Sequence, residues 1–320
     1  MATGKIHVMG IDFGSTTAKT VILDGNGALV AWSVSHKGSV SDEGAQASIA
    51  EALARAGLKQ SDITRTVATG YGRRMLDVAD KSYTEITCHA RGAVSMVPHA
   101  RLVIDIGGQD SKVIAVDPQG LVSQFAMNDR CAAGTGKFFE ALARAVQVPL
   151  EDMGPMALDA RENIVISSMC ATFAETEVIS LLAEGKSKPE VLGAVHAAVA
   201  SRTVGLVARV GKRDPIVMTG GVARNVAAVH YIEQALGTTL IIPPTPQIAG
   251  ALGAALIALD EIEITVGNAD EDDRVDGAVA AARACGTPAC KTPPATSAVP
   301  ADTVPLHGPI RAVPPVPTSI

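Results

Sequence analysis

The chain carries one short pattern twice. An apolar strand that ends in Asp-x-Gly leads through a turn into a second strand, first over residues 5–23 and again over residues 101–116. A third strand is expected to follow each copy, over residues 28–35 and 120–127. The repeat is degenerate in identity but clear in pattern, and it predicts a chain built from two related halves.

The segments between and after the repeats predict an α/β protein. Apolar residues recur there at helical spacing, and short apolar runs are typical of buried strands. Helices are expected over residues 42–56, 135–146, 173–183, 189–210 and 247–259, and further strands over residues 66–70, 215–218 and 239–242. With 320 residues, of which 47% are hydrophobic, the chain can form one large or two medium domains.

Composition narrows the class of partner. Aromatic residues make up only 3% of the chain and the net charge is −6 without a basic run, so nucleic acid is not expected as a partner. The N-terminus lacks the features of a signal peptide. The longest uncharged apolar run, residues 248–259, is shorter than the ~20 residues of a membrane span. We therefore expect a cytoplasmic protein without a membrane partner.

The first Asp-x-Gly loop has the chemistry of an anion site. A tight turn rich in glycine and hydroxyl residues presents backbone N–H groups to phosphate, and a carboxylate at its start can hold Mg²⁺ through water. Asp12 is the candidate catalytic and Mg²⁺-linked carboxylate. The candidate phosphate contacts are Gly14, Ser15, Thr16, Thr17 and Lys19.

Two later loops extend this chemistry. Asp105 repeats the role of Asp12, and Gln109 has an amide that can orient an attacking water. Gly107 and Gly108 lie between them.

A third loop joins a strand to a helix, where glycines allow a close approach of adenosine and the helix N-terminus favours phosphate. Its candidate contacts are Gly220, Gly221, Val222 and Asn225.

The ordered set of loops resembles the actin, heat-shock chaperone and sugar-kinase superfamily. That resemblance implies two RNase H-like α/β domains with a nucleotide cleft between them. The first domain is expected over residues 1–100, with the last helix near residues 245–262 packing back on it, and the second over residues 101–262. The Ala- and Pro-rich residues 263–320 are expected to form a disordered tail.

Two cysteines do not fit a simple kinase. Cys131 and Cys170 each precede a predicted helix, where unpaired N–H groups and the helix dipole stabilise a thiolate or an anionic cluster. Either cysteine alone is equally compatible with a buried core position, but the matched placement favours metal ligands. Cys88 is expected to be a small core residue. Nothing indicates a role for Cys285 or Cys290.

A count of ligands points to a dimer. A cubane iron–sulfur cluster needs four thiolates, and a two-fold dimer would supply two from each chain. Zinc in the same four-thiolate site is the alternative. ATP-driven closure of the two domains around the nucleotide cleft would then tilt the helices that hold the metal.

Four segments resemble a specific ATPase family: residues 105–112, 128–137, 167–180 and 219–225. It is the family that activates 2-hydroxyacyl-CoA dehydratases and supplies the ATPase subunits of benzoyl-CoA reductases. The resemblance, over about residues 5–260, implies ATP, Mg²⁺ and one [4Fe-4S] cluster per homodimer or heterodimer, with Cys131 and Cys170 as ligands. It also implies a ferredoxin or flavodoxin donor and a larger iron–sulfur partner that acts on a CoA thioester.

Several functions remain open at this point. The preference for Ala and for Arg over Lys fits a GC-rich genome, which favours a subunit of a dearomatising benzoyl-CoA reductase. The activator of an (R)-2-hydroxyacyl-CoA dehydratase is the alternative. A sugar kinase or a non-enzymatic ATP switch would leave both cysteines without a role.

Overall fold

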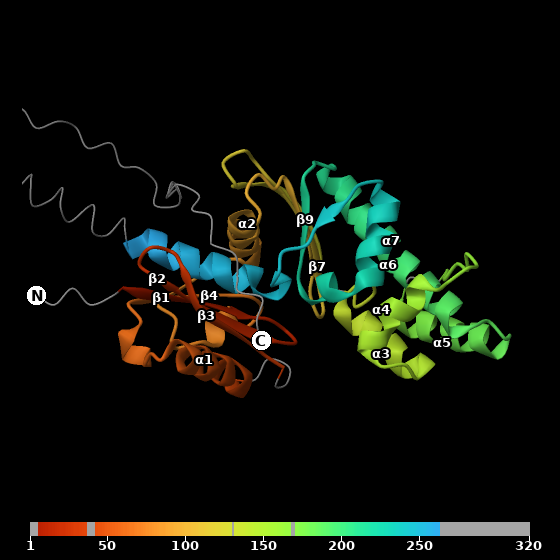
Figure 1. The fold of residues 1–320 in the computed structure, drawn as a ribbon, viewed down its shortest axis with the longest axis horizontal. Helices are drawn as coiled ribbons and strands as arrows, with labels where there is room; N and C mark the ends of the chain where they lie inside the picture. Colours follow the sequence, from red (N-terminus) through yellow and green to blue (C-terminus); the bar gives the residue numbers. More distant parts are fainter. Residues whose placement is uncertain (1–5, 37–41, 130, 168–169, 263–320) are drawn as a thin grey trace, which may run out of the picture.

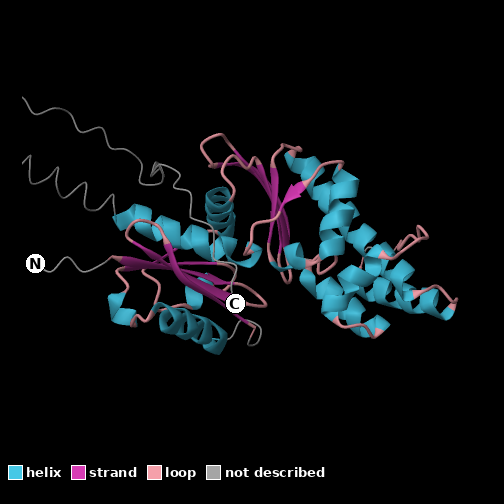
Figure 2. Ribbon diagram, in the orientation of Figure 1, coloured by secondary structure: helices cyan, strands magenta, loops and turns pink. Residues whose placement is uncertain are grey.

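The computed structural model describes residues 6–36, 42–129, 131–167 and 170–262. The expected tail, with Cys285 and Cys290, lies outside these residues. The described part contains two five-stranded mixed sheets with helices packed on them (Figures 1 and 2). The expected α/β class with two related halves is confirmed. The expected domain boundaries stay a prediction.

The first sheet has the strand order β3-β2-β1-β4-β5. Its strands are β1 (His7–Phe13), β2 (Ala18–Asp24), β3 (Leu29–Ser35), β4 (Arg65–Thr69) and β5 (Lys81–Ser82). β1 pairs antiparallel with β2 and parallel with β4. Helix α1 (Asp42–Ala56) packs on this sheet, and its Ile49 belongs to a cluster of buried apolar residues that includes Ile11 of β1 and Ile22 of β2.

The second sheet repeats that order as β8-β7-β6-β9-β10. Its strands are β6 (Leu102–Ile106), β7 (Ser111–Val116), β8 (Val122–Asn128), β9 (Ile216–Thr219) and β10 (Leu240–Ile241). β6 pairs antiparallel with β7 and parallel with β9, as β1 does with β2 and β4. The internal duplication seen in the sequence is therefore a duplication of sheet topology.

Register gives the duplication a chemical meaning. Asp12 lies opposite Lys19 on β2 and Thr69 on β4. Asp105 lies opposite Lys112 on β7, and Thr219 is its neighbour on β9. Both sheets therefore place the same acid, cation and hydroxyl at matching positions.

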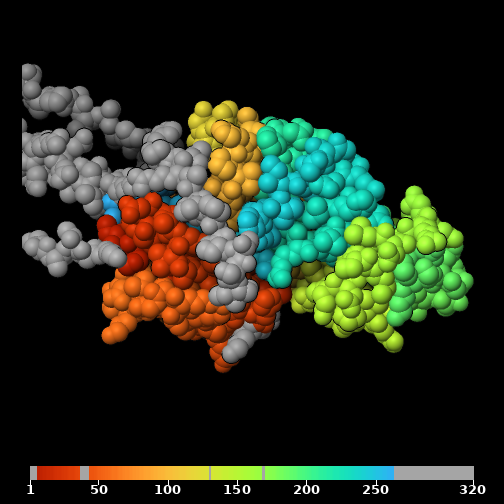
Figure 3. All heavy atoms as spheres, in the orientation of Figure 1, coloured from red at the N-terminus to blue at the C-terminus, as the bar shows by residue number. Residues whose placement is uncertain are grey.

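The remaining helices are α2 (Glu85–Met96), α3 (Gly136–Val146), α4 (Leu150–Leu158), α5 (Ala171–Ala183), α6 (Lys188–Val210), α7 (Val226–Leu236) and residues 249–262. The part that contains α3, α4 and α5 projects on the side away from the first sheet (Figures 1 and 3). The expected helix at residue 247 begins as a short 3-10 turn, Pro246–Ile248. Helix α4 was not expected, because Gly154 and Pro155 interrupt its sequence pattern.

Helix α6 is the longest element. Among the described residues it is the one helix long and apolar enough to cross a membrane. The run of residues 248–259, which is longer without a charge, is too short to do so. Most of its apolar residues are buried, including Val191, Leu192, Val195 and Val199. We therefore interpret α6 as a core helix that packs with the second sheet.

Helix α2 joins the two halves. Its apolar residues Ile86 and Ala90 belong to the core formed with the second sheet. On the other side, a Cβ at Gly92 would overlap the carbonyl of Ala249, and a Cβ at Gly253 would overlap that of Cys88. The two helices therefore cross at backbone contact. Cys88 is fully buried there, as expected for a small core residue.

Candidate nucleotide site and cysteine pair

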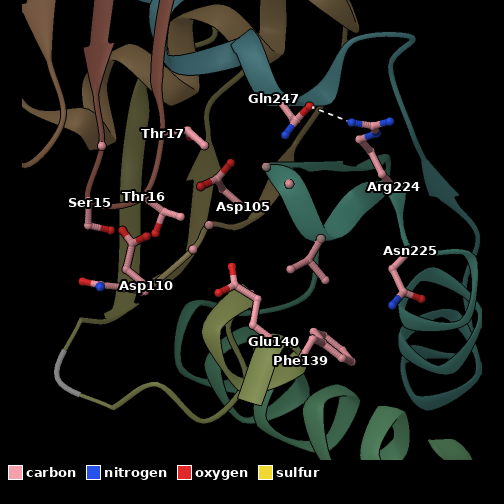
Figure 4. A pocket seen from close by; sticks show the side chains of 18 of the residues that line it. Ser15, Thr16, Thr17, Asp105, Asp110, Phe139, Glu140, Arg224, Asn225 and Gln247 are labelled. Atoms are coloured by element: carbon pink, nitrogen blue, oxygen red, sulfur yellow. Dashed lines mark hydrogen bonds between the residues drawn. The ribbon is translucent and has the colours of Figure 1, made fainter. Parts of the chain in front are cut away.

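One cavity lies where the two sheets meet, with a volume of about 560 Å³ (Figure 4). All three glycine loops line it, and so do all the predicted nucleotide and catalytic residues. From the first loop these are Asp12, Gly14, Ser15, Thr16, Thr17 and Lys19; from the second, Asp105, Gly107, Gly108 and Gln109; from the third, Gly220, Gly221, Val222 and Asn225. The fold brings together loops that are far apart in sequence.

The first two loops touch each other. A Cβ at Gly108 would overlap the side chain of Thr16, so only glycine allows this approach. The Thr16 hydroxyl is buried and has no hydrogen-bond partner within the described structure. A buried hydroxyl without a partner is uncommon in folded proteins. Thr16 belongs to the first loop and its side chain faces Gly108 of the second loop, a position that fits a hydrogen bond from the hydroxyl to a phosphate oxygen.

Asp12 is the ionised carboxylate on the side of the first sheet. It is 4% exposed, and its Oδ2 accepts a hydrogen bond from Lys19 Nζ at 3.1 Å. Burial alone would raise the pKa of Asp12, but the charges of Lys19 and His89 outweigh burial and lower it. The carboxylate therefore stays charged in the cleft.

Asp105 has a more crowded environment. Its Oδ1 accepts a hydrogen bond from Thr219 Oγ1 at 2.7 Å, and its Oδ2 lies 3.2 Å from His89 Nε2 and 3.5 Å from Lys112 Nζ. Burial opposes the charge, yet these two cations hold the pKa of Asp105 well below its usual range. Since both oxygens are engaged, Asp105 is oriented by the protein itself.

The donor set fits Mg²⁺ bound mainly through water and phosphate. No group of three or more His, Cys, Asp or Glu side chains within the described ranges could hold a metal ion. Mg²⁺ commonly takes one or two carboxylates and fills its octahedron with water and nucleotide oxygens. Asp12 and Asp105 line the cleft and are two carboxylates of the kind that Mg²⁺ takes.

Several further charged residues line the cleft beside the candidate catalytic and nucleotide residues. Lys112 is almost fully buried and contacts Asp105, Asp110 and Glu85. Burial opposes its charge, but these carboxylates raise the pKa of Lys112. His89 carries no local sequence signal, because it reaches the cleft only through the packing of α2. Further acidic residues that line the cavity are Asp129, Glu140 and Glu151.

Cys131 and Cys170 are free and exposed, and both lie outside the cavity lining. Cys170 is the N-cap of α5, where the backbone N–H groups of Thr172 and Phe173 lower the pKa of its thiol. Cys131 precedes α3, and its carbonyl accepts a hydrogen bond from Asn128 Nδ2 at 2.9 Å. Both cysteines precede helices, as expected: Cys170 directly as the N-cap, and Cys131 through the loop that ends at the N-cap Thr135.

The two cysteines supply thiol donors of the kind that a shared metal site requires, and that shared site stays a prediction. Within the described residues neither belongs to a group of three or more potential ligands. Two exposed thiols on one chain would leave two positions of a cubane cluster for a second chain, since such a cluster takes four thiolates.

Comparisons with known proteins identify the family to which the chain is similar. The BadF/BadG/BcrA/BcrD ATPase family model matches residues 9–258. The activator of lactoyl-CoA dehydratase from Anaerotignum propionicum is 47% identical over 80% of this chain and 98% of its own length. One of the benzoyl-CoA reductase subunits from Thauera aromatica is 34% identical over 77% of this chain and 91% of its own.

A solved structure extends the similarity to the fold. The activator of the 2-hydroxyisocaproyl-CoA dehydratase from Clostridium difficile, with bound ADPNP, superposes with a TM-score of 0.79. The match has 40% identity and covers 82% of this chain and 98% of the other. The expected two-domain ATPase fold is thereby confirmed.

Proposed function

The chain belongs to the BadF/BadG/BcrA/BcrD ATPase family, and from this membership we propose that it is the ATPase activator of a 2-hydroxyacyl-CoA dehydratase. In this role it hydrolyses ATP in the cleft and passes one electron to the dehydratase component. The observation that carries the proposal is the combination of a nucleotide-type cleft with two exposed cysteines that precede helices α3 and α5. A kinase would need only the cleft.

We prefer a dehydratase as the partner over the benzoyl-CoA reductase that composition favoured. Identity is 47% to the lactoyl-CoA dehydratase activator and 34% to the benzoyl-CoA reductase chain. Composition reflects the genome, whereas similarity along the whole domain reflects the site, so similarity is the better guide. A role in benzoyl-CoA reduction is the second candidate, and the substrate assay below separates the two.

We assign the ATP site as follows. Thr16 and the Gly107–Gly108 segment bind the β- and γ-phosphates, Asp12 and Asp105 hold Mg²⁺ through water, and Gln109 orients the attacking water. The third loop and the N-terminus of α7 receive the adenosine side. The unpartnered hydroxyl of Thr16 and the contact between the first two loops support this arrangement.

We assign Cys131 and Cys170 to a [4Fe-4S] cluster shared by two chains. When bound, such a cluster supplies one-electron redox chemistry. The backbone N–H groups at the start of α5 lower the pKa of the Cys170 thiol, which favours the thiolate that a metal ligand requires. A ferredoxin or flavodoxin is the proposed electron donor, and a larger iron–sulfur protein that binds the CoA thioester is the proposed acceptor.

The test is an activation assay under anaerobic conditions. Purified protein, a dehydratase component, a low-potential reductant and MgATP are combined with a 2-hydroxyacyl-CoA. We expect formation of the enoyl-CoA that requires ATP hydrolysis, with ADPNP inactive. Reduction of benzoyl-CoA by a reductase partner, without dehydratase activation, would favour the second candidate. Phosphorylation of a sugar by colourless protein would contradict both.

A further inference from the structure

His196 is a fully buried histidine on α6 that none of the roles above uses. Its ring lies between Phe139 of α3 and Tyr231 of α7, with centroid distances of 4.8 and 6.1 Å. Phe139 and Asn225 both line the nucleotide cavity (Figure 4). His196 therefore lies directly behind the wall of the cleft that carries the third loop.

Asn225 has its side chain fixed by the helix that follows it. Asn225 Oδ1 lies 3.1 Å from the backbone nitrogen of Ala227 and 3.0 Å from that of Ala228. Both nitrogens are donors at the open start of α7, so the atom that faces them must be the amide oxygen. The amide nitrogen is then the atom left to interact elsewhere.

The amide nitrogen reaches His196. Asn225 Nδ2 lies 3.0 Å from His196 Nε2, whereas Asn225 Oδ1, already engaged by α7, lies 3.2 Å from it. On its other side, His196 Nδ1 lies 2.7 Å from the carbonyl oxygen of Leu192, which can only accept. One arrangement satisfies every atom: Nδ1–H donates to Leu192, and bare Nε2 accepts from Asn225.

We propose that His196, as the neutral Nδ1–H tautomer, is a positioning residue for the nucleotide. By accepting from Asn225 it fixes which end of the amide caps α7 and which end is free. The second N–H of the amide and the capped N-terminus of α7 are then available to the cleft. In Figure 4 the amide nitrogen of Asn225 lies on the side of Phe139 and the oxygen on the side of α7. This inference rests on the nucleotide role assigned to the cleft.

The surroundings of His196 favour the neutral ring. Burial lowers the pKa of His196, and the hydrogen bonds with Leu192 and Asn225 oppose that shift only in part. Among the described residues, Tyr231 is the titratable side chain that stacks on the ring, and no charged side chain contributes to the shift. A proton on Nε2 would face the donor on Asn225. The amide would then lose this bond or, after turning over, lose both bonds to α7.

Steric evidence shows that the amide has little room to adjust. A Cβ at Gly154 of α4 would come within 2.7 Å of Asn225 Oδ1. A Cβ at Gly193, on the same helix as His196, would come within 2.7 Å of the Tyr231 hydroxyl. The packing of α4, α6 and α7 therefore leaves Asn225 confined between its cap and His196.

The first test is the tautomer itself. Long-range ¹H–¹⁵N spectra of the full protein, labelled with ¹⁵N-histidine, report which ring nitrogen carries the proton. The signal of His196 is assigned by its loss in His196→Phe or, if that variant does not fold, in His196→Gln. We expect the neutral Nδ1–H form at pH 7. An Nε2–H tautomer or an imidazolium would overturn the proposal.

The second test is binding of ADPNP, measured by calorimetry. His196→Phe keeps an aromatic ring between Phe139 and Tyr231 but removes the acceptor. Because the amide of Asn225 is then no longer held in one orientation, we expect affinity to fall about fivefold, equivalent to about 1 kcal/mol. His196→Gln restores an acceptor and should recover most of that loss. His230→Phe, at an exposed position on α7, is the matched control and should bind as the wild type does.

Two results would contradict the positioning role. One is wild-type affinity in folded His196→Phe; the other is an equal loss in His196→Gln, which would indicate packing rather than the acceptor. Neither readout needs the metal cluster or the dehydratase. A failed activation assay therefore leaves the inference standing, and failure of these tests leaves the proposed function standing.

Discussion

The backbone nitrogen of Lys137 donates a hydrogen bond of 2.7 Å to the carbonyl oxygen of Gly108. Gly136, the residue before it, donates in the same way to Gly107 at 2.9 Å. The first turn of α3 is therefore fastened to the second phosphate-type loop. Cys131 lies in the loop that leads to the N-cap Thr135, so backbone hydrogen bonds connect the second phosphate-type loop to the helix that follows this cysteine.

A substitution at Gly108 tests this loop. The added methyl group of Gly108→Ala would overlap Thr16, so the first two loops must separate. We expect ATP hydrolysis to fall by at least about tenfold, equivalent to about 1.4 kcal/mol in the barrier, with the iron content unchanged. Steady-state phosphate release and iron analysis measure the two effects.

Gly205→Ala is the matched control for that substitution. Gly205 lies in α6, where a Cβ would meet nothing within 4 Å. Alanine should stabilise this helix by roughly 0.5–1 kcal/mol and leave hydrolysis unchanged. If Gly108→Ala hydrolyses ATP as fast as Gly205→Ala does, the assigned contact between the loops is not needed for catalysis.

The cysteine assignment predicts a separation of functions. Cys131→Ser and Cys170→Ser should each lose the cluster and dehydratase activation, because either change leaves two of four thiolates in the dimer. ADPNP binding should stay within about twofold of wild type, since neither cysteine lines the cavity. Absorbance and calorimetry measure these outcomes.

Cys88→Ala provides the control for those variants. Cys88 is buried between α2 and residues 249–262, and burial raises the pKa of its thiol to about 12. We therefore expect it to keep full iron content. Iron loss in Cys88→Ala equal to that in Cys170→Ser would argue against the assignment of the exposed pair.

His89 gives the fold a defined pH dependence. Burial would lower the pKa of His89, but the charge of Asp105 and their hydrogen bond raise it above the usual value of 6.5. The stabilisation of the fold by the His89–Asp105 pair is therefore complete below about pH 6.5. It is lost as pH rises through the pKa of His89 in the folded state. We expect the difference in Tm between wild type and His89→Gln to be largest below pH 6.5 and to shrink at higher pH.

A second background checks the origin of that dependence. In Asp105→Asn the anionic partner is absent, so the effect of His89→Gln on Tm should no longer vary with pH in this way. Calorimetric scans of wild type, His89→Gln, Asp105→Asn and the double variant measure Tm as a function of pH. The same pH profile in both backgrounds would rule out the His89–Asp105 pair as its cause.

The sequence allowed the fold and most of the cleft to be predicted, for a local reason. Asp12 and Asp105 each end an apolar strand before a glycine turn, so strand, turn and acid can be recognised without knowledge of the tertiary structure. Cys131 and Cys170 were recognisable because each precedes a helical pattern. These features depend on neighbours in sequence.

The residues that were missed depend on packing. His89 reaches Asp105 only because α2 lies between the two halves, and His196 reaches Asn225 only because α6 packs on α7. Neither contact leaves a mark in the local sequence. The environment of Lys112 also depends on packing, since only the fold surrounds it with three carboxylates. Composition favoured benzoyl-CoA reduction, whereas identity to the relatives supports the alternative, a dehydratase activator, better.

Native mass spectrometry of anaerobically purified protein tests the central claim, that Cys131 and Cys170 form half of a metal site. The account predicts a mass of two chains plus a single four-iron, four-sulfide cluster, and dissociation to metal-free chains after chelation. A single chain that carries its own complete cluster, or a dimer that retains its iron when Cys170 is serine in both chains, would contradict it.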